Sequence, residues 1–97
     1  AIILIGFSGF KEAILDFTSA MRTRFDDASL FYERGQLYLM MTPPQSEKAL
    51  LDFRAALQRN EVFWAAMLGE VQSLIQIGQY TDAIRICKVI IEGKQML

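Results

Sequence analysis

The sequence lacks histidine altogether and holds a single cysteine. Without histidine, imidazole-based acid–base catalysis and histidine metal ligation are excluded. One cysteine excludes an internal disulfide and a zinc site made of several thiolates. Acidic and basic residues nearly balance, 11 against 10, so the net charge is −1 and the chain lacks the basic surplus that nucleic-acid binding requires. We therefore expect no metal, no cofactor and no nucleic-acid partner.

Long hydrophobic runs are also lacking, since no apolar stretch reaches the roughly 18 residues that a membrane span needs. Apolar residues nevertheless make up 53% of the 97 residues, and a chain this apolar is not disordered. Its length suits one domain. Residues 1–5 are all apolar without a basic segment before them, so we interpret the start as a cut inside a larger sequence rather than a secretory signal. The lack of disulfides favours an intracellular location, with the cytoplasm as the first expectation.

Three segments of the chain resemble one another. When the segments are aligned, one column contains Ala13, Ala49 and Ala83. A second column, four positions later, contains Phe17, Phe53 and Cys87. These columns are offset by 36 and then 34 positions, whereas a second series is offset by 34 and then 36. The second series comprises Ala1, Gly35 and Val71, followed by Leu4, Tyr38 and Leu74. A period of 34 with an insertion of two near Pro43 and Pro44 accounts for both series.

The apolar residues within each segment recur at i, i+3, i+4 and i+7, which is the spacing of one helix face. Six helices are predicted, at about 1–7, 9–24, 27–41, 46–59, 62–77 and 79–92. Ser8 and Gly9 are expected to separate the first two helices. Pro43 is expected to end the third, because proline lacks an N–H group. Gly78 and Gly93 are expected to end the last two helices.

This period and the helix–turn–helix pattern resemble the tetratricopeptide repeat (TPR) family. The residues that carry the resemblance are Ala1, Leu4, Phe10, Ala13, Phe17 and Ala20 in the first repeat, Phe31, Gly35, Tyr38, Ala49, Phe53 and Ala56 in the second, and Met67, Leu74, Gly78, Tyr80 and Ala83 in the third. The third repeat departs from the pattern at Val71, where a small residue is usual, and at Cys87 and Ile90.

The resemblance implies an all-α fold, an α-solenoid of antiparallel helix pairs that forms part of a right-handed superhelix. Residues 1–97 would form a single domain, with a truncated first repeat at 1–25, a second at 26–61, a third at 62–93 and a tail at 94–97. The alanines of the shared column would let the two helices of a repeat cross closely.

In TPR arrays the first helices of successive repeats line a concave face that binds peptides or helices. The residues of this chain that the resemblance places there are Ser29, Tyr32, Glu33, Gln36, Leu39 and Met40 in the second repeat and Ala65, Leu68, Gly69, Gln72, Ile75 and Gln76 in the third. The candidate peptide-binding residues among them are Tyr32, Gln36, Leu39, Met40, Leu68, Gln72, Ile75 and Gln76. The set holds no lysine or arginine, which excludes the basic clamp that some TPR domains use for the carboxylate of chaperone tails. A neutral, apolar face suits an apolar peptide or helix.

These residues predict a non-enzymatic protein–protein interaction scaffold. An alternative is a purely structural segment of a longer solenoid, which stacks on neighbouring repeats or self-associates. A third hypothesis is a recruiting part of an enzyme whose catalytic domain lies elsewhere. RNA-reading helical repeats have a similar period but are more basic, so we rank them last.

No catalytic constellation stands out. Asp16 and Asp52 recur in register, and we interpret both as solvated acids on helix surfaces. Asp26–Asp27 suits a turn and a helix start. Cys87 is expected to be a buried, inert thiol, because no histidine is present to activate it. Trp64 is expected to pack on its neighbour Phe63 and the preceding helix.

Overall fold

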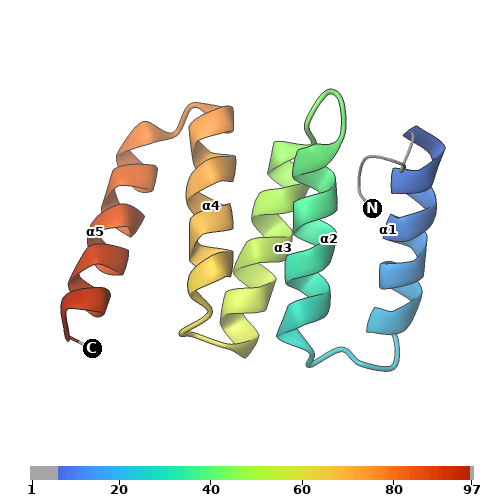
Figure 1. Ribbon diagram of the computed structural model, residues 1–97, viewed down its shortest axis with the longest axis horizontal. Coiled ribbons are helices and arrows are strands. Elements are labelled where there is room, and N and C mark those ends of the chain that lie inside the picture. The colour runs from blue at the N-terminus through green and yellow to red at the C-terminus, as the bar shows by residue number, and fades with distance from the viewer. Residues whose placement is uncertain (1–6, 97) are drawn as a thin grey trace.

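The computed structural model describes the backbone of residues 7–96 and the side chains of residues 9–93. Within that part the chain forms five helices and no strand. They are α1 (Phe7–Met21), α2 (Ala28–Met40), α3 (Ser46–Arg59), α4 (Trp64–Ile77) and α5 (Tyr80–Met96). Consecutive helices run in opposite directions and each packs on the next (Figure 1). The predicted all-α fold of antiparallel helices is therefore confirmed, while the helix predicted at 1–7 lies almost wholly outside the described residues.

Two predicted helix boundaries are wrong. Ser8 and Gly9 lie inside α1, which begins at Phe7. The first turn of a helix tolerates such residues, because its N–H groups have no intrahelical acceptor to lose. Gly93 does not end α5 either, since the helix continues to Met96. A Cβ atom on Gly93 would lie 2.5 Å from Cη2 of Trp64, so this glycine makes room for the indole rather than a turn.

The other helix ends follow the sequence signals. Pro43 and Pro44 follow the end of α2 at Met40, as predicted. Gly78 ends α4 in the left-handed region, with φ of 95°, and its N–H group donates to the carbonyl of Leu74 at 3.0 Å. A glycine adopts this conformation without the steric cost that a Cβ atom brings.

Asp27 caps the N-terminus of α2, so the predicted helix-start role is confirmed for this residue. Its Oδ1 accepts hydrogen bonds from the backbone N–H group of Ser29 at 3.0 Å and from the Ser29 hydroxyl at 2.6 Å. The hydroxyl hydrogen bond is the main reason why the pKa of Asp27 lies below 3.8, with the hydrogen bond from Arg24 adding to it. The carboxylate form of Asp27 therefore stabilises the folded chain.

Replacing Asp27 by alanine is expected to lower the thermal midpoint at neutral pH. Because the pKa of Asp27 is depressed in the folded state, its contribution is complete above the ordinary value of 3.8 and is lost as the pH falls through the folded pKa. The difference in midpoint between the parent chain and Asp27→Ala should therefore shrink in acid, as measured by circular dichroism at a series of pH values. An Asp26→Ala control, at an exposed neighbour, should show no such pH-dependent gap. A difference that stays constant into acid would contradict the capping role of the ionised group.

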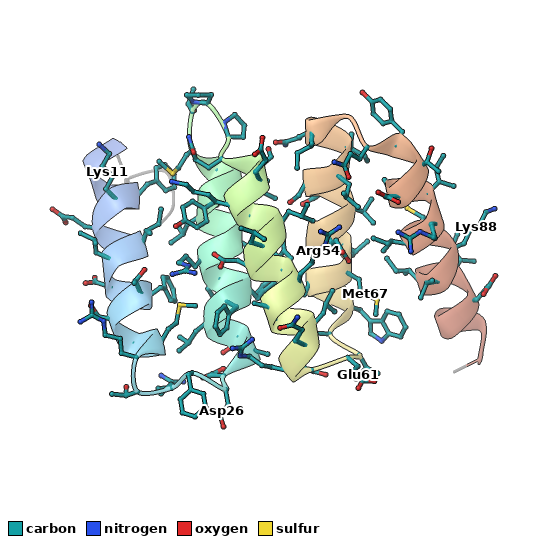
Figure 2. The ribbon with its side chains drawn as sticks, turned by 180° about the vertical axis from the view of Figure 1, so that it is seen from behind. Lys11, Asp26, Arg54, Glu61, Met67 and Lys88 are labelled. Carbon is teal, nitrogen blue, oxygen red and sulfur yellow. The ribbon has the colours of Figure 1, made fainter. Side chains whose placement is uncertain are left out.

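The helices form two layers. Helix α3 contacts both α2 and α4, and α2 also contacts α4 directly. Figure 1 shows α2 in front of α3, and Figure 2, seen from behind, shows α3 in front. Helices α2 and α4 therefore lie in one layer, and α3 lies behind them. Two of the predicted alanine contacts are confirmed, since Ala49 and Ala83 are buried in the core, whereas Ala13 is only half-buried.

Phe53 of α3 is the centre of the core between α2, α3 and α4. Its side chain is fully buried, and its ring lies against two glycines, Gly35 of α2 and Gly69 of α4. A Cβ atom added to Gly35 would lie 3.0 Å from the ring, and one added to Gly69 would lie 2.5 Å from it. Gly69 is therefore buried under an aromatic ring, and its predicted place on the concave face is wrong.

Two of the three departures of the third repeat, Val71 and Cys87, compensate for each other. Phe53 packs on Gly35 in the second repeat, and the corresponding residues of the third are Cys87 and Val71. Val71 is buried and belongs to a core cluster against which Cys87 packs, half-buried. The cluster comprises Leu50, Val71, Leu74, Ala83 and Ile90. The large Phe53 on the small Gly35 is thus replaced by the smaller Cys87 near the larger Val71. The two changes together conserve the packed volume.

Asp52 is not the solvated acid that we predicted. Its residue is buried, with 4% of its surface exposed, and its carboxylate accepts two hydrogen bonds from Arg34, at 2.8 and 2.7 Å. Arg34 also donates to the hydroxyl of Thr18 at 3.0 Å, so it joins α1, α2 and α3. Arg34 lies on a different helix, far from Asp52 in sequence, which is why the local pattern did not reveal the pair. Asp16, in contrast, is exposed as predicted.

Candidate functional site

The predicted concave-face residues lie on two helices of one layer. In α2, Gly35 faces α3. Tyr32, Gln36 and Met40 recur every four positions, so they lie on one side of α2, and this side borders a hollow next to α1. In α4 the corresponding side carries the exposed residues Leu68, Gln72, Ile75 and Gln76. Since α2 and α4 touch each other, these two sides form one face of the molecule.

Tyr32 connects the α2 part of this face to α4. Its ring lies 5.9 Å from the ring of Phe53 and 5.0 Å from that of Phe63, measured between centroids. Its hydroxyl accepts a hydrogen bond from Nε2 of Gln36 at 2.6 Å. Tyr32 is therefore half-buried and held in place by its ring contacts and by Gln36.

Leu39 differs from the other predicted face residues. It is half-buried and packs against the cluster around Phe53, together with Tyr38 and Leu57. An arginine at position 39 would disturb this cluster, so a Leu39 variant cannot separate loss of binding from loss of folding. Leu68 and Ile75 are the better probes, because 50% and 48% of their surfaces are exposed.

A hollow of about 300 Å³ brings four predicted residues together with two that were not predicted for this face. The predicted residues are Tyr32, Glu33, Gln36 and Met40, and the added residues are Leu37 of α2 and Phe17 of α1. Phe17 is half-buried, so part of its ring forms the wall of the hollow. Its place in a repeat column predicted a packing role and gave no indication that part of the ring is exposed in the hollow.

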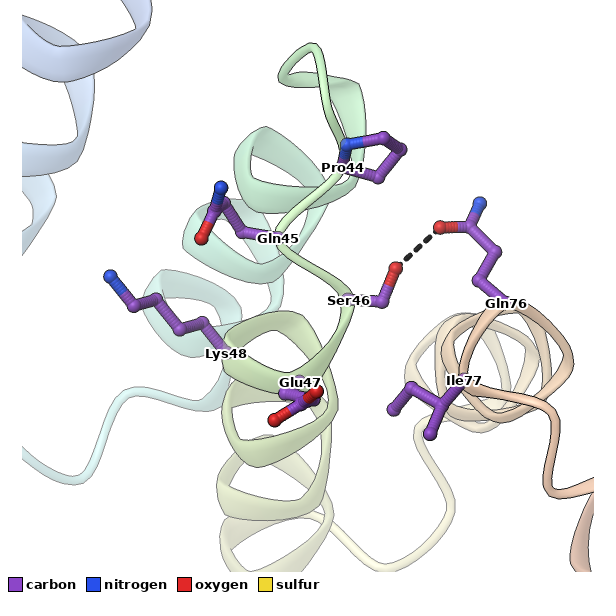
Figure 3. Close-up of a pocket in the computed structure, with 7 residues that line it drawn as sticks. All are labelled: Pro44, Gln45, Ser46, Glu47, Lys48, Gln76 and Ile77. Atoms are coloured by element: carbon purple, nitrogen blue, oxygen red, sulfur yellow. Dashed lines mark hydrogen bonds between the residues drawn. The ribbon is translucent and has the colours of Figure 1, made fainter.

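Gln76 lies at the end of the face where α3 begins. Its Oε1 accepts a hydrogen bond from the hydroxyl of Ser46, and both residues line a hollow of about 460 Å³ (Figure 3). The remaining lining residues are Pro44, Gln45, Glu47, Lys48 and Ile77. This end of the face is polar, and the two-residue insertion of the second repeat supplies part of its wall.

Trp64 is packed, as predicted, but its contact with α5 was not foreseen. Its ring lies against Gly93 of α5 and against the cluster that contains Val71 and Ile90. The side chain is half-buried. Trp64 thus closes one end of the contact between α4 and α5.

Among the described residues, no three His, Cys, Asp or Glu side chains come together to hold a metal ion. No helix in the described part of the chain is long and apolar enough to cross a membrane. The pKa of Arg34 is raised, mainly by its hydrogen bonds to Asp52, but this ion pair is enclosed between helices and stabilises the fold.

Comparison with known proteins identifies no relative. The chain matches no protein-family model, and no curated protein or solved structure is significantly similar to it. The TPR resemblance stays a prediction.

Proposed function

We propose that the chain is a non-enzymatic protein–protein interaction scaffold of TPR type, which binds an apolar peptide or helix on the face of α2 and α4. The observation that carries the proposal is the pair Leu68 and Ile75, two large apolar side chains that are about half exposed on one side of α4. Gln72 and Gln76 are exposed beside them, so the α4 part of the face is uncharged. Apolar side chains with amide groups at their edges suit a ligand with an apolar face.

The repeat geometry supports the TPR part of the proposal. The glycine at position 35, the alanines at 49 and 56 and the aromatic ring at 53 pack together in the second repeat. In this arrangement α2 and α4 would be the first helices of two successive repeats. Their free sides would then form the concave face of a right-handed superhelix.

The proposal is tested by selection from a phage-displayed random peptide library against the purified chain. Helix-forming sequences with several leucine or aromatic residues should be enriched. Leu68→Arg should weaken their binding at least about tenfold, because it places a charge where an apolar side chain would be buried. Selection of acidic or basic sequences that bind Leu68→Arg equally well would contradict the proposal.

Leu51→Arg is the matched control. Leu51 is 67% exposed on α3, and it lies about 200° around the helix from Phe53, which points toward α2 and α4. The substitution therefore adds the same charge on the opposite side of the molecule. Binding of the selected peptides should be unchanged in Leu51→Arg, and circular dichroism should show that both variants keep their helices.

A structural role is the second candidate, and α5 favours it. Tyr80, Ile84 and Ile91 are 61%, 57% and 57% exposed, which leaves an apolar stripe along the outer helix. A segment of a longer solenoid, or a self-associating chain, would bury this stripe. Sedimentation of the chain without ligand distinguishes the candidates, since self-association through α5 would be abolished by Ile84→Arg.

A further inference from the structure

The outer surface of α4 and α5 corresponds, one repeat later, to the surface of α2 and α3. In the earlier repeat that surface is covered by α4. Leu50 and Leu57 of α3 face α4, and their counterparts one repeat later are Ile84 and Ile91. Leu50 is 7% exposed, whereas Ile84 and Ile91 are each 57% exposed. On the neighbouring helix, Tyr32 and Leu39 of α2 are half-buried, and their counterparts in the next repeat are Leu68 and Ile75 of α4, which are exposed. Each of these buried or half-buried residues of α2 and α3 therefore has an exposed counterpart in α4 or α5.

We propose that this surface binds one amphipathic α-helix of a partner protein, seated on α4 and α5 as α4 is seated on α2 and α3. The inference rests on the proposed function, because Leu68 and Ile75 belong to both surfaces, and it names the kind of partner and its position. The template for this arrangement is the interface that α4 forms with α2 and α3 in this chain, and the partner helix would take the place of α4 one repeat later. The partner helix would run antiparallel to α5 and bury Ile84 and Ile91.

The size of Cys87 determines one residue of the partner helix. In the template, the ring of Phe53 fills the space against Gly69, so only a glycine fits at that position of α4. Cys87 takes the place of Phe53 in the next repeat and is much smaller. A partner with glycine there would leave a void, and one with a large apolar side chain would fill it. We therefore expect leucine or a residue of similar size in register with Gly69.

The charge of Lys88 determines the next residue. Arg54 of α3 pairs with Glu70 of α4, with Nε 2.9 Å from the carboxylate oxygen. Lys88 takes the place of Arg54 in the next repeat and is exposed. Figure 2 shows Arg54 beside α4 and Lys88 on the outer side of α5. An acidic residue in register with Glu70 would pair with Lys88, so the partner helix carries a large apolar residue followed by an acidic one.

A second copy of the chain fits this surface less well. Ile84 and Ile91 are symmetric about a point between residues 87 and 88. If two α5 helices paired antiparallel about that point, each Lys88 would lie close to the Lys88 of the other copy. Like charges in contact disfavour such a pair. The lysine thus favours a partner with an acidic side chain over a symmetric dimer.

The test uses two fluorescently labelled peptides of residues 62–78, both with Leu68→Lys and Ile75→Lys on their outward side for solubility. One keeps glycine at position 69 and the other carries Gly69→Leu. Anisotropy titration with the whole chain should show that the leucine peptide binds about tenfold more tightly, the effect expected from burying a leucine side chain. Equal affinities, or no binding of either peptide, would overturn the proposal.

Variants of the chain identify the surface that the peptide occupies. Ile84→Arg should abolish binding of the leucine peptide, and Leu51→Arg should leave it unchanged. The double variant Val71→Ala/Cys87→Phe, which restores a large residue on a small one, should reverse the preference and favour the glycine peptide. A difference in helix propensity between the peptides cannot produce such a reversal. Lys88→Glu should weaken binding a few-fold, and Glu70→Lys in the peptide should restore it.

Failure of this inference can be distinguished from failure of the proposed function. If library-selected peptides lose binding to Leu68→Arg but not to Ile84→Arg, the partner uses the α2–α4 face alone, so the function stands and the α4–α5 site is overturned. If the chain sediments as a dimer that Ile84→Arg dissociates, a second copy occupies the surface and the partner-helix proposal is overturned.

Discussion

Replacing Asp52 by alanine is expected to lower the free energy of unfolding by about 3–5 kcal/mol, the cost of removing one partner from a buried ion pair. The Asp52 side chain is 5% exposed and the Arg34 side chain 20%, so the guanidinium left behind could not be fully hydrated. It would also lose two hydrogen bonds to the carboxylate, at 2.8 and 2.7 Å. Urea unfolding followed by circular dichroism measures the change.

Asp16→Ala is the matched control for this prediction. Asp16 occupies the position of Asp52 one repeat earlier, but it is exposed. Its removal should change the free energy of unfolding by less than about 0.5 kcal/mol, as is usual for surface substitutions. Equal effects of Asp16→Ala and Asp52→Ala would show that the ion pair does not stabilise the fold as described.

A double substitution separates the pair from the space it fills. Replacing Arg34 by methionine and Asp52 by leucine removes both charges and keeps apolar volume between α2 and α3. The double variant should recover most of the stability that Asp52→Ala loses, because no unpaired charge is left buried. It would also break the hydrogen bond to Thr18, so a remaining loss would report the connection to α1.

Local signals in the sequence located the helices well wherever they act on the backbone. Pro43 removes an N–H group, and Gly78 adopts a positive φ, so both end helices for reasons that depend on a few neighbouring residues. Gly93 shows the limit of this reasoning. It is a glycine because the Trp64 ring lies against it, and a contact between two different helices leaves no mark on the local pattern.

The same distinction applies to the candidate site. Helical periodicity placed Leu39 and Ile75 on corresponding sides of two helices, as the structure has them. It could not show that Leu39 is half-buried against the cluster around Phe53 while Ile75 is 48% exposed. The burial of each side chain depends on which other helices pack against it. It also missed Arg34 as the partner of Asp52, because the two lie on different helices.

Phe53→Ala is the second substitution with a large expected effect. The ring is fully buried between α2 and α4, so its removal should lower the free energy of unfolding by about 3–5 kcal/mol, which combines lost burial with the cost of the cavity. That loss is a large part of the total stability of a domain this size. Phe53→Leu should cost less and stay measurable by urea unfolding. Phe25→Ala, which deletes a ring that is 67% exposed, should cost less than about 0.5 kcal/mol.

Gly69→Ala tests the geometry of the same contact from the other side. Alanine normally stabilises a helix by about 1 kcal/mol relative to glycine, but here its Cβ atom would lie 2.5 Å from Cε1 of Phe53, and overpacking costs about 1–3 kcal/mol. Gly69→Ala should therefore be destabilising alone and stabilising in the Phe53→Ala background, where the ring is gone. This change of sign gives a large coupling energy in a double-mutant cycle. Independent effects of the two substitutions would mean that the Phe53 ring does not rest on Gly69, and the volume argument for Cys87 and its partner helix would lose its template.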